Sequence, residues 1–366
     1  MARLQTLQVT RGVAANLVVF SHLYTVEARY AGGEILPAFS FYGVAGVDIF
    51  FVLSGFIMVV VAGKGTRAIQ FLWRRAARIY PPYWLVSLVV LATSLAQPTW
   101  VNSSAAGPVS LWRSFLLVPD STLPLLVVGW TLIHEVYFYL VFAILLALRI
   151  PIPVGLLGWG LVLLLVTILG GDYVASFPLG RVWTNPLTAE FVMGAAIGVL
   201  YDHKNMRGAA WAGVTGIAML ATSIVFVAPA LSLANNAHLD AWRVVLFGIP
   251  AALIVYWLAA LEQNTVRMPA KLLVALGDWS YATYLTHVLV LSALGRIIHS
   301  LAPSGATSGL VLIVVGVTAA NLAGAVMFRF LERRPLGCYI DSARRHSRGR
   351  SGSKSSPRAS FMRSIE

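Results

Sequence analysis

Residues 41–58 read FYGVAGVDIFFVLSGFIM and run on into further valines, so that one acid, Asp48, interrupts an otherwise apolar stretch. About 20 mostly apolar residues are the length of a helix that crosses a bilayer. Gly43, Gly46 and Gly55 allow a neighbouring helix to approach closely. The stretch therefore predicts a transmembrane helix that packs inside a bundle.

Similar runs recur along all 366 residues, of which 58% are hydrophobic and 11% charged. A soluble domain carries about 25% charged residues, so this composition excludes an ordinary soluble enzyme, a disordered protein and a fibrous repeat. The runs are continuous rather than alternating, which excludes a membrane β-barrel. We predict an all-α, polytopic membrane bundle of about ten transmembrane helices. The ten candidate spans are residues 7–27, 41–62, 79–97, 125–148, 153–170, 186–201, 209–229, 241–261, 278–298 and 308–331.

Two of these spans are weak, because polar residues interrupt the first and the sixth is short and contains Glu190. The alternative for the first is a cleaved signal peptide. Arg11, Asn16 and His22 break its apolar centre and no small-residue cleavage site follows, which argues against that alternative.

The net charge of +13 is distributed unevenly along the chain. Ten spans put both termini on one side, and the loops on that side carry most of the Lys and Arg. The loops on the other side hold only Arg29, Arg113, Arg181 and Arg243. By the positive-inside rule we expect both termini in the cytoplasm, the N-in/C-in topology.

The chain divides into a membrane domain, residues 1–336, and a basic tail, residues 337–366. Nine basic residues follow from Arg333 onward, against two acids, and the tail lacks the apolar periodicity that a folded unit needs. Beside a membrane, a basic tail adsorbs to anionic lipid. We therefore expect a disordered cytoplasmic tail bound to lipid rather than to nucleic acid. The single cysteine, Cys338, excludes a disulfide framework and a multi-cysteine metal site, and we predict no metal site.

Charges within membrane spans are costly, so each one is a candidate functional residue. Arg11 and His22 are eleven residues apart, which is three turns and about 16 Å of helix, so they share one face. We therefore predict that Arg11 and His22 line one polar groove at two successive positions. Arg11 suits a phosphate or a carboxylate, and His22 suits proton transfer near neutral pH. Asp48 needs a cation partner such as Arg11, or a hydrated cavity.

Three further stretches carry candidate residues. In FLWRRAARIYPPYW, residues 71–84, the arginines cluster before two prolines, either as a topology signal or as a clamp for a phosphorylated ligand. In GWTLIHEVYFYL, residues 129–140, Glu135 lies among aromatic residues, an arrangement that proteins use to hold sugar rings. In GDWSYATYLTHVLV, residues 277–290, Tyr281 is six positions before His287.

Together these stretches resemble the membrane acyltransferase-3 family over about residues 5–336. The family's R-x10-H motif is matched by Arg11 and His22. The matches to its other motifs, in chain order, are Gly46, Val47, Asp48, Phe50, Phe51, Ser54, Gly55 and Phe56; Arg75 and Arg78; Trp130, Thr131, Leu132, Glu135 and Phe138; Ser280, Tyr281, Tyr284, Leu285 and His287. The closing E-x-P element is approximated by Glu332 and Pro335, with one extra residue between them.

The resemblance implies a multi-pass enzyme of the bacterial inner membrane that moves an acyl group, by expectation acetyl, from cytosolic acyl-CoA to a hydroxyl of a glycan or lipid-linked saccharide. Acceptors in the family include exopolysaccharide, lipopolysaccharide, Nod factors and macrolides. Acyl-CoA is then a co-substrate, and no cofactor is permanently bound. The acyl group and the acceptor stay open, as does the alternative of an enzyme that acts on the sugar of a small secreted metabolite.

On this resemblance, His22, Arg11 and Glu135 are the expected catalytic residues. His22 would act as general base or carry the acyl group as an acyl-imidazole, and Glu135 would orient His22 or the acceptor. The residues expected to bind the CoA phosphates are Arg75, Arg78 and Arg74. The supporting polar core is expected to consist of Asp48, paired with Arg11, together with Ser54, Tyr281 and His287. A proton-coupled transporter that uses Arg11, Asp48, Glu135 and His287 is the main alternative.

Overall fold

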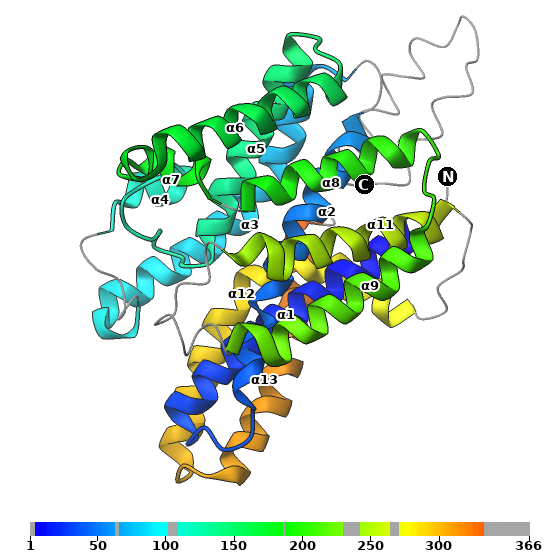
Figure 1. Cartoon of the computed structure of the whole chain (residues 1–366). Coiled ribbons are helices and arrows are strands. Elements are labelled where there is room, and N and C mark those ends of the chain that lie inside the picture. Colours follow the sequence, from blue (N-terminus) through cyan, green and yellow to red (C-terminus); the bar gives the residue numbers. More distant parts are fainter. Residues whose placement is uncertain are drawn as a thin grey trace, which may run out of the picture.

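The computed structural model describes residues 4–62, 66–101, 109–185, 187–229, 242–263 and 271–332. Over these residues the protein is all-helical and contains no strand, which confirms the predicted fold class (Figure 1). The basic tail and its predicted disorder lie outside the described residues.

Every predicted span coincides with a helix. The long helices are α1 (Gln5–Tyr30), α2 (Ala45–Ala62), α3 (Ala68–Ala96), α5 (Gly129–Ala147), α6 (Ile152–Ala175), α8 (Leu187–Asp202), α9 (Ala209–Thr222), α11 (Ile249–Gln263), α12 (Lys271–Leu301) and α13 (Ala306–Met327). The short elements are η1 (Ala38–Val44), η2 (Pro98–Trp100), α4 (Leu111–Leu116), α7 (Pro178–Trp183) and the π-helical turns η3 (Ser223–Val227), η5 (Val244–Gly248) and η6 (Phe328–Glu332).

Eight of the helical segments in the described part of the chain are long and apolar enough to cross a membrane. The two predicted spans that are not among them are α1, which is interrupted by charged residues, and α8, which has 16 residues. A helix of this length extends about 24 Å, less than the hydrocarbon core of a bilayer. The number of ten spans and the N-in/C-in topology stay predictions.

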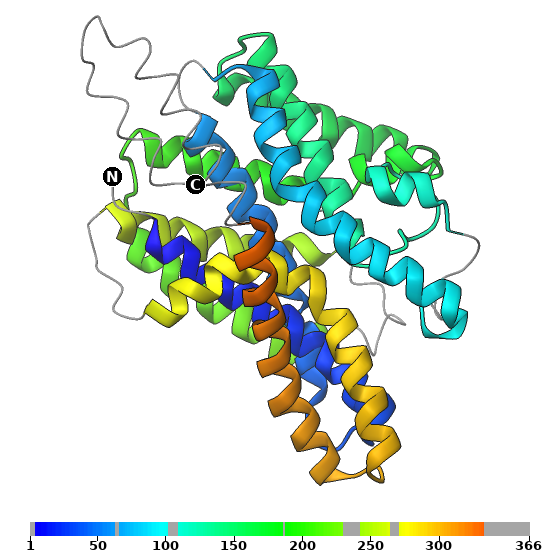
Figure 2. The ribbon, with the colours of Figure 1, turned by 180° about the vertical axis from the view of Figure 1, so that it is seen from behind.

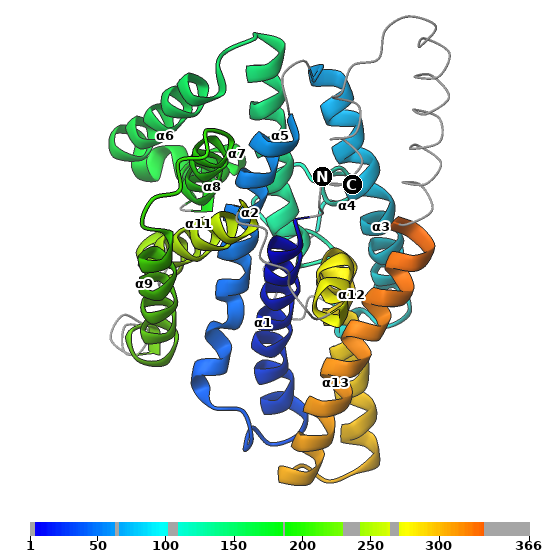
Figure 3. The same ribbon diagram turned by 90° about the vertical axis from the view of Figure 1, so that its right-hand side faces the viewer.

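Helix α1 lies in the middle of the molecule, between α2 on one side and α12 with α13 on the other (Figure 3). Seen from behind, α13 runs back along α12 after a tight turn (Figure 2). Small residues bring α1 and α12 into contact, because a Cβ on Gly277 would lie 1.9 Å from the carbonyl oxygen of Gln8. The most polar helix of the bundle therefore packs between other helices.

Two acids outside the predicted site, Glu262 and Glu27, hold the two ends of α1. The Glu262 carboxylate accepts hydrogen bonds from the backbone N–H groups of Gln5 at 2.7 Å and Thr6 at 2.9 Å, where the helix itself has no partners for them. At the other end, fully buried Glu27 accepts the backbone N–H groups of Glu34 at 2.9 Å and Ile35 at 3.3 Å. Both acids therefore satisfy backbone donors that the membrane interior would otherwise leave unpaired.

The aromatic residues around the two consecutive prolines of α3 hold the short helix α4. Tyr80, Tyr83 and Trp84 donate side-chain hydrogen bonds of 2.7–3.1 Å to the last three backbone carbonyls of α4, residues 114–116. The loop between α3 and α5 is thus fastened to α3 beside the arginine cluster.

The close packing of α2 against α8 gives a stability prediction. A Cβ on Gly55 would lie 2.1 Å from the carbonyl oxygen of Phe191, whereas a Cβ on Gly158 in α6 would meet nothing within 4 Å. Gly55→Ala should destabilise the protein by about 1–3 kcal/mol, because the two backbones must move apart. Gly158→Ala is the matched control and should leave thermal unfolding in detergent unchanged. Equal unfolding midpoints for the two variants would contradict this packing.

Candidate functional site

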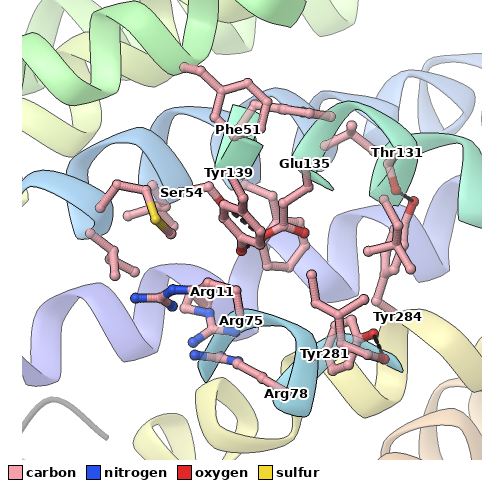
Figure 4. Close-up of a pocket in the computed structure, with 18 residues that line it drawn as sticks. Arg11, Phe51, Ser54, Arg75, Arg78, Thr131, Glu135, Tyr139, Tyr281 and Tyr284 are labelled. Carbon is pink, nitrogen blue, oxygen red and sulfur yellow. Dashed lines mark hydrogen bonds between the residues drawn. The ribbon is translucent and has the colours of Figure 1, made fainter. Parts of the chain in front are cut away.

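A cavity opens among α1, α2, α3, α5, α8 and α12 (Figure 4). Six of the residues predicted from the sequence line it: Arg11, Ser54, Arg75, Arg78, Glu135 and Tyr281. The other lining residues are Val47, Phe50, Phe51, Leu53, Ile57, Met58, Ile79, Thr131, Leu132, Tyr139, Phe191 and Tyr284. The structure therefore joins residues that lie as far apart in the sequence as α1 and α12.

Three guanidinium groups gather on one side of this cavity. Arg11 comes from α1, and Arg75 and Arg78 come from successive turns of α3 (Figure 4). Arg75 lies over the rings of Phe71 at 5.5 Å and Tyr139 at 5.8 Å. Within the described residues, no hydrogen bond or ion pair to a carboxylate engages the guanidinium of Arg11 or of Arg78. Positive charge is thus available here for an anionic ligand.

Arg74 is not part of this group. Its side chain does not line the cavity, and its buried Nε has no hydrogen-bond partner within the described chain. One position turns an α-helix by about 100°, so the side chains of Arg74 and Arg75 leave the helix in different directions. Arg75 and Arg78, three positions apart, share the face that meets the cavity.

Glu135 faces the arginines across the cavity (Figure 4). Its Oε1 accepts a hydrogen bond from Ser54 Oγ at 3.2 Å and another from the hydroxyl of Tyr139. Among the described residues its hydrogen bonds go to these two hydroxyls and none goes to His22, which was one of its expected partners. A carboxylate with two hydroxyl donors is held in one orientation beside the positive groups.

The tyrosines of α12 form the wall of the cavity. Tyr281 donates its hydroxyl proton to the carbonyl of Ile79 at 2.8 Å, and Tyr284 shares a 2.8 Å hydrogen bond with Thr131. Sequence reasoning did not include Tyr139, Tyr284 or Thr131 among the site residues. The four-residue spacing between Glu135 and Tyr139 was the available signal, because such residues meet on a helix.

His22 pairs with His287 outside the lining of the cavity. The two rings meet edge to face with centroids 4.8 Å apart, and His287 Nε2 lies 3.4 Å from His22 Nδ1. The pair lies close to the cavity wall, since Tyr284 lines the cavity and its ring centroid is 5.7 Å from that of His287. Arg11 and His22 thus occupy different polar groups along one face of α1, as two successive points.

The predicted pairing of Asp48 with Arg11 is wrong. Arg243 binds fully buried Asp48 with both ends of its guanidinium, Nε to Oδ1 at 2.9 Å and Nη2 to Oδ2 at 2.8 Å. The reason is the phase of α2, in which Gly46 faces Ala14 of α1. Asp48, two positions further on, points about 200° away, towards η5 and α8.

Arg243 was expected to be a loop charge, yet its side chain is only 16% exposed at the start of η5. Glu190, also fully buried, lies close enough to Asp48 and Arg243 to interact with both. Asp48 and Glu190 thus both lie near the Arg243 guanidinium, which hydrogen-bonds to Asp48. This group is separate from the cavity. Within the described residues, no cluster of three or more His, Cys, Asp or Glu side chains is arranged to hold a metal ion.

Comparison with known proteins identifies the family of the chain. The sequence model of one family, described as an acyltransferase domain, matches residues 4–329. The chain is 32% identical to the exopolysaccharide production protein ExoZ of Rhizobium meliloti (strain 1021), over 80% of this chain and 89% of that protein. It is 28% identical to the acyltransferase MdmB of Streptomyces mycarofaciens, over 94% and 96% of the two chains. No solved structure gives a significant match.

The Asp48–Arg243 pair predicts a specific coupling. Removing one partner of a buried ion pair leaves the other charge uncompensated and costs about 3–5 kcal/mol. Asp48→Ala and Arg243→Ala should each destabilise the protein strongly in a denaturant titration, and the double variant should lose much less than the sum of the two.

The matched control is the cycle of Asp48→Ala with Arg11→Ala. Arg11 contributes no hydrogen bond to Asp48, whose two carboxylate oxygens are taken by Arg243. The effects of these two substitutions should therefore add. Strong coupling in this second cycle, with additivity in the first, would contradict the observed pairing.

Proposed function

The chain belongs to the acyltransferase-3 family and is an acyltransferase, and we propose that it transfers an acyl group, by preference acetyl, from acyl-CoA to a hydroxyl of an envelope or secreted glycan. The observation that carries the proposal is the cavity in which three arginines face Glu135, Ser54 and Tyr139. It offers positive charge for phosphates at one side and an oriented carboxylate at the other.

The donor is proposed to bind at the arginines. No described carboxylate forms a hydrogen bond or a close ion pair with Arg11 or Arg78, although buried Glu332 lies near enough to both to interact electrostatically. Guanidinium groups bind phosphates in a bidentate manner. The CoA phosphates would lie at these groups, at the cytoplasmic mouth in the predicted topology. The narrow pantetheine arm would then enter the cavity and bring the thioester towards Glu135.

His22 is proposed to carry the proton or the acyl group. As general base, it takes the proton of the acceptor hydroxyl while the hydroxyl oxygen forms the ester bond with the acyl carbon. The bond between that carbon and sulfur breaks, and the CoA thiolate leaves with the proton that His22 has taken up. As nucleophile, His22 would first receive the acyl group itself and pass it to the hydroxyl. Either route balances without a further reactant.

Glu135 is proposed to act on the donor side rather than on His22. Its two hydroxyl partners, Ser54 and Tyr139, line the same cavity as the arginines and are in place to contact a thioester.

A glycan acceptor is favoured by the similarity of the chain to ExoZ, an exopolysaccharide production protein. In the proposed arrangement the acceptor approaches His22 from the end of α1 opposite to Arg11, and the enzyme works as a multi-pass protein of the bacterial inner membrane. The transporter alternative used Arg11, Asp48, Glu135 and His287 as one pathway. Three of these residues have different partners in the structure. Asp48 pairs with Arg243, Glu135 accepts from two hydroxyls, and His287 pairs with His22, so they do not form one continuous pathway.

A first test measures the release of CoA thiol from acetyl-CoA by purified protein, with a glycan preparation from the source organism as acceptor. His22→Ala should reduce the rate by at least about 100-fold, the usual contribution of a general base. His299→Ala, at the exposed far end of α12, is the control and should be active. Full activity of His22→Ala would exclude His22 from the chemistry.

A second test separates donor binding from topology. Arg78→Gln and Arg11→Gln should weaken the binding of acetyl-CoA about tenfold or more, because a charge-assisted contact to phosphate is lost. Arg74→Gln removes the same charge one turn away without touching the cavity and should leave the affinity unchanged. Equal affinities in all three variants, measured by calorimetry, would reduce these arginines to topology signals.

A further inference from the structure

The hydrogen bonds around His287 determine where its proton lies. Its Nδ1 is 2.7 Å from the backbone carbonyl oxygen of Tyr284 and 3.2 Å from that of Thr283. A carbonyl oxygen only accepts hydrogen bonds, so Nδ1 of His287 carries a proton. The ring is fully buried and therefore has little freedom to turn over.

The same reasoning applies to His22. Its Nδ1 lies 3.0 Å from the backbone carbonyl oxygen of Val18, one turn earlier in α1, so this nitrogen also carries a proton. His22 Nδ1 is, in addition, the atom that faces His287 Nε2 at 3.4 Å. Two N–H groups cannot point at each other, so His287 Nε2 is bare and accepts from His22.

The proton positions of the pair leave one bare nitrogen on His22. With Nδ1 protonated, the neutral ring has its lone pair on Nε2, and no described residue hydrogen-bonds to that atom. A base whose other nitrogen is oriented by a third group is the arrangement that activates histidines in acyl-transfer enzymes. Here the orienting acceptor is a second histidine rather than a carboxylate.

We propose that His287 is a positioning residue that holds His22 in the Nδ1–H tautomer and so makes His22 Nε2 the atom that takes the acceptor proton or the acyl group. This inference rests on the proposed function for the role of His22. When Nε2 gains a proton or an acyl group, the ring becomes positively charged and Nδ1–H becomes a stronger donor. Val18 and His287 then accept that stronger hydrogen bond without a change of position.

The first arm of the test needs no activity. The full-length protein, labelled with ¹⁵N at its histidines and held in a lipid nanodisc, is studied by NMR under mildly alkaline conditions. The signals of His22 are assigned by their loss in His22→Gln. We expect a protonated Nδ1 and a bare Nε2. A bare Nδ1 with a protonated Nε2 would overturn the proposal, whatever the protein catalyses.

The second arm uses two substitutions of His287. The amide of Gln reaches the place of ring Nε2 and can still accept from His22, whereas the amide of Asn reaches only the place of Nδ1. With acetyl-CoA, His287→Gln should keep kcat within about threefold of the parent. His287→Asn should lower kcat about tenfold or more with an unchanged KM for acetyl-CoA, as for other orienting partners.

The two arms separate this inference from the proposed function. Equal losses for Gln and Asn, or a loss in KM alone, would mean that His287 only packs and would overturn the positioning role. The predicted tautomer together with a fully active His22→Ala would leave the arrangement of the pair intact and contradict the chemistry assigned to His22.

Discussion

The structure depends on enclosing the polar face of helix α1, which carries Arg11 and His22 through a bundle that is otherwise apolar. Neither side chain is stable against hydrocarbon, so the polar face of α1 needs protein against it. The α2, α12 and α13 helices supply it, and contact through Gly277 lets the α12 backbone reach that of α1, while Val13 and Phe20 on another face of α1 are exposed. Glu262 satisfies the exposed backbone donors where α1 begins. The polar face of α1 is thereby turned inward, where it meets groups from other helices.

The polar side chains of the bundle form three groups with different partners. The arginines and Glu135 share a cavity, His22 and His287 form a pair beside Tyr284, and Asp48 is paired with Arg243. The first two groups include successive positions of α1, which suits a reaction in which the donor and the acceptor approach from opposite ends of one helix. The third shares α2 with Ser54 and connects that helix to η5, on the side turned away from α1.

The long apolar runs predicted the helices well, because a membrane helix is defined by local composition. Six of the residues that the sequence motifs indicated line one cavity: Arg11, Ser54, Arg75, Arg78, Glu135 and Tyr281. Partners were harder to predict, because they depend on the rotational phase of packed helices. Arg243 lies 195 positions from Asp48, and His287 lies 265 positions from His22. The acids Glu27 and Glu262 serve backbone groups and follow no side-chain motif.

The most direct test of the account is a structure of the protein by electron cryomicroscopy with a non-hydrolysable acetyl-CoA analogue bound. The account predicts the phosphates of the nucleotide at Arg11, Arg75 and Arg78, and the thioester position inside the cavity beside Glu135. His22 Nε2 should lie within reach of the acceptor hydroxyl that attacks this thioester. An analogue bound outside this cavity, with the three arginines free of phosphate, would contradict the account.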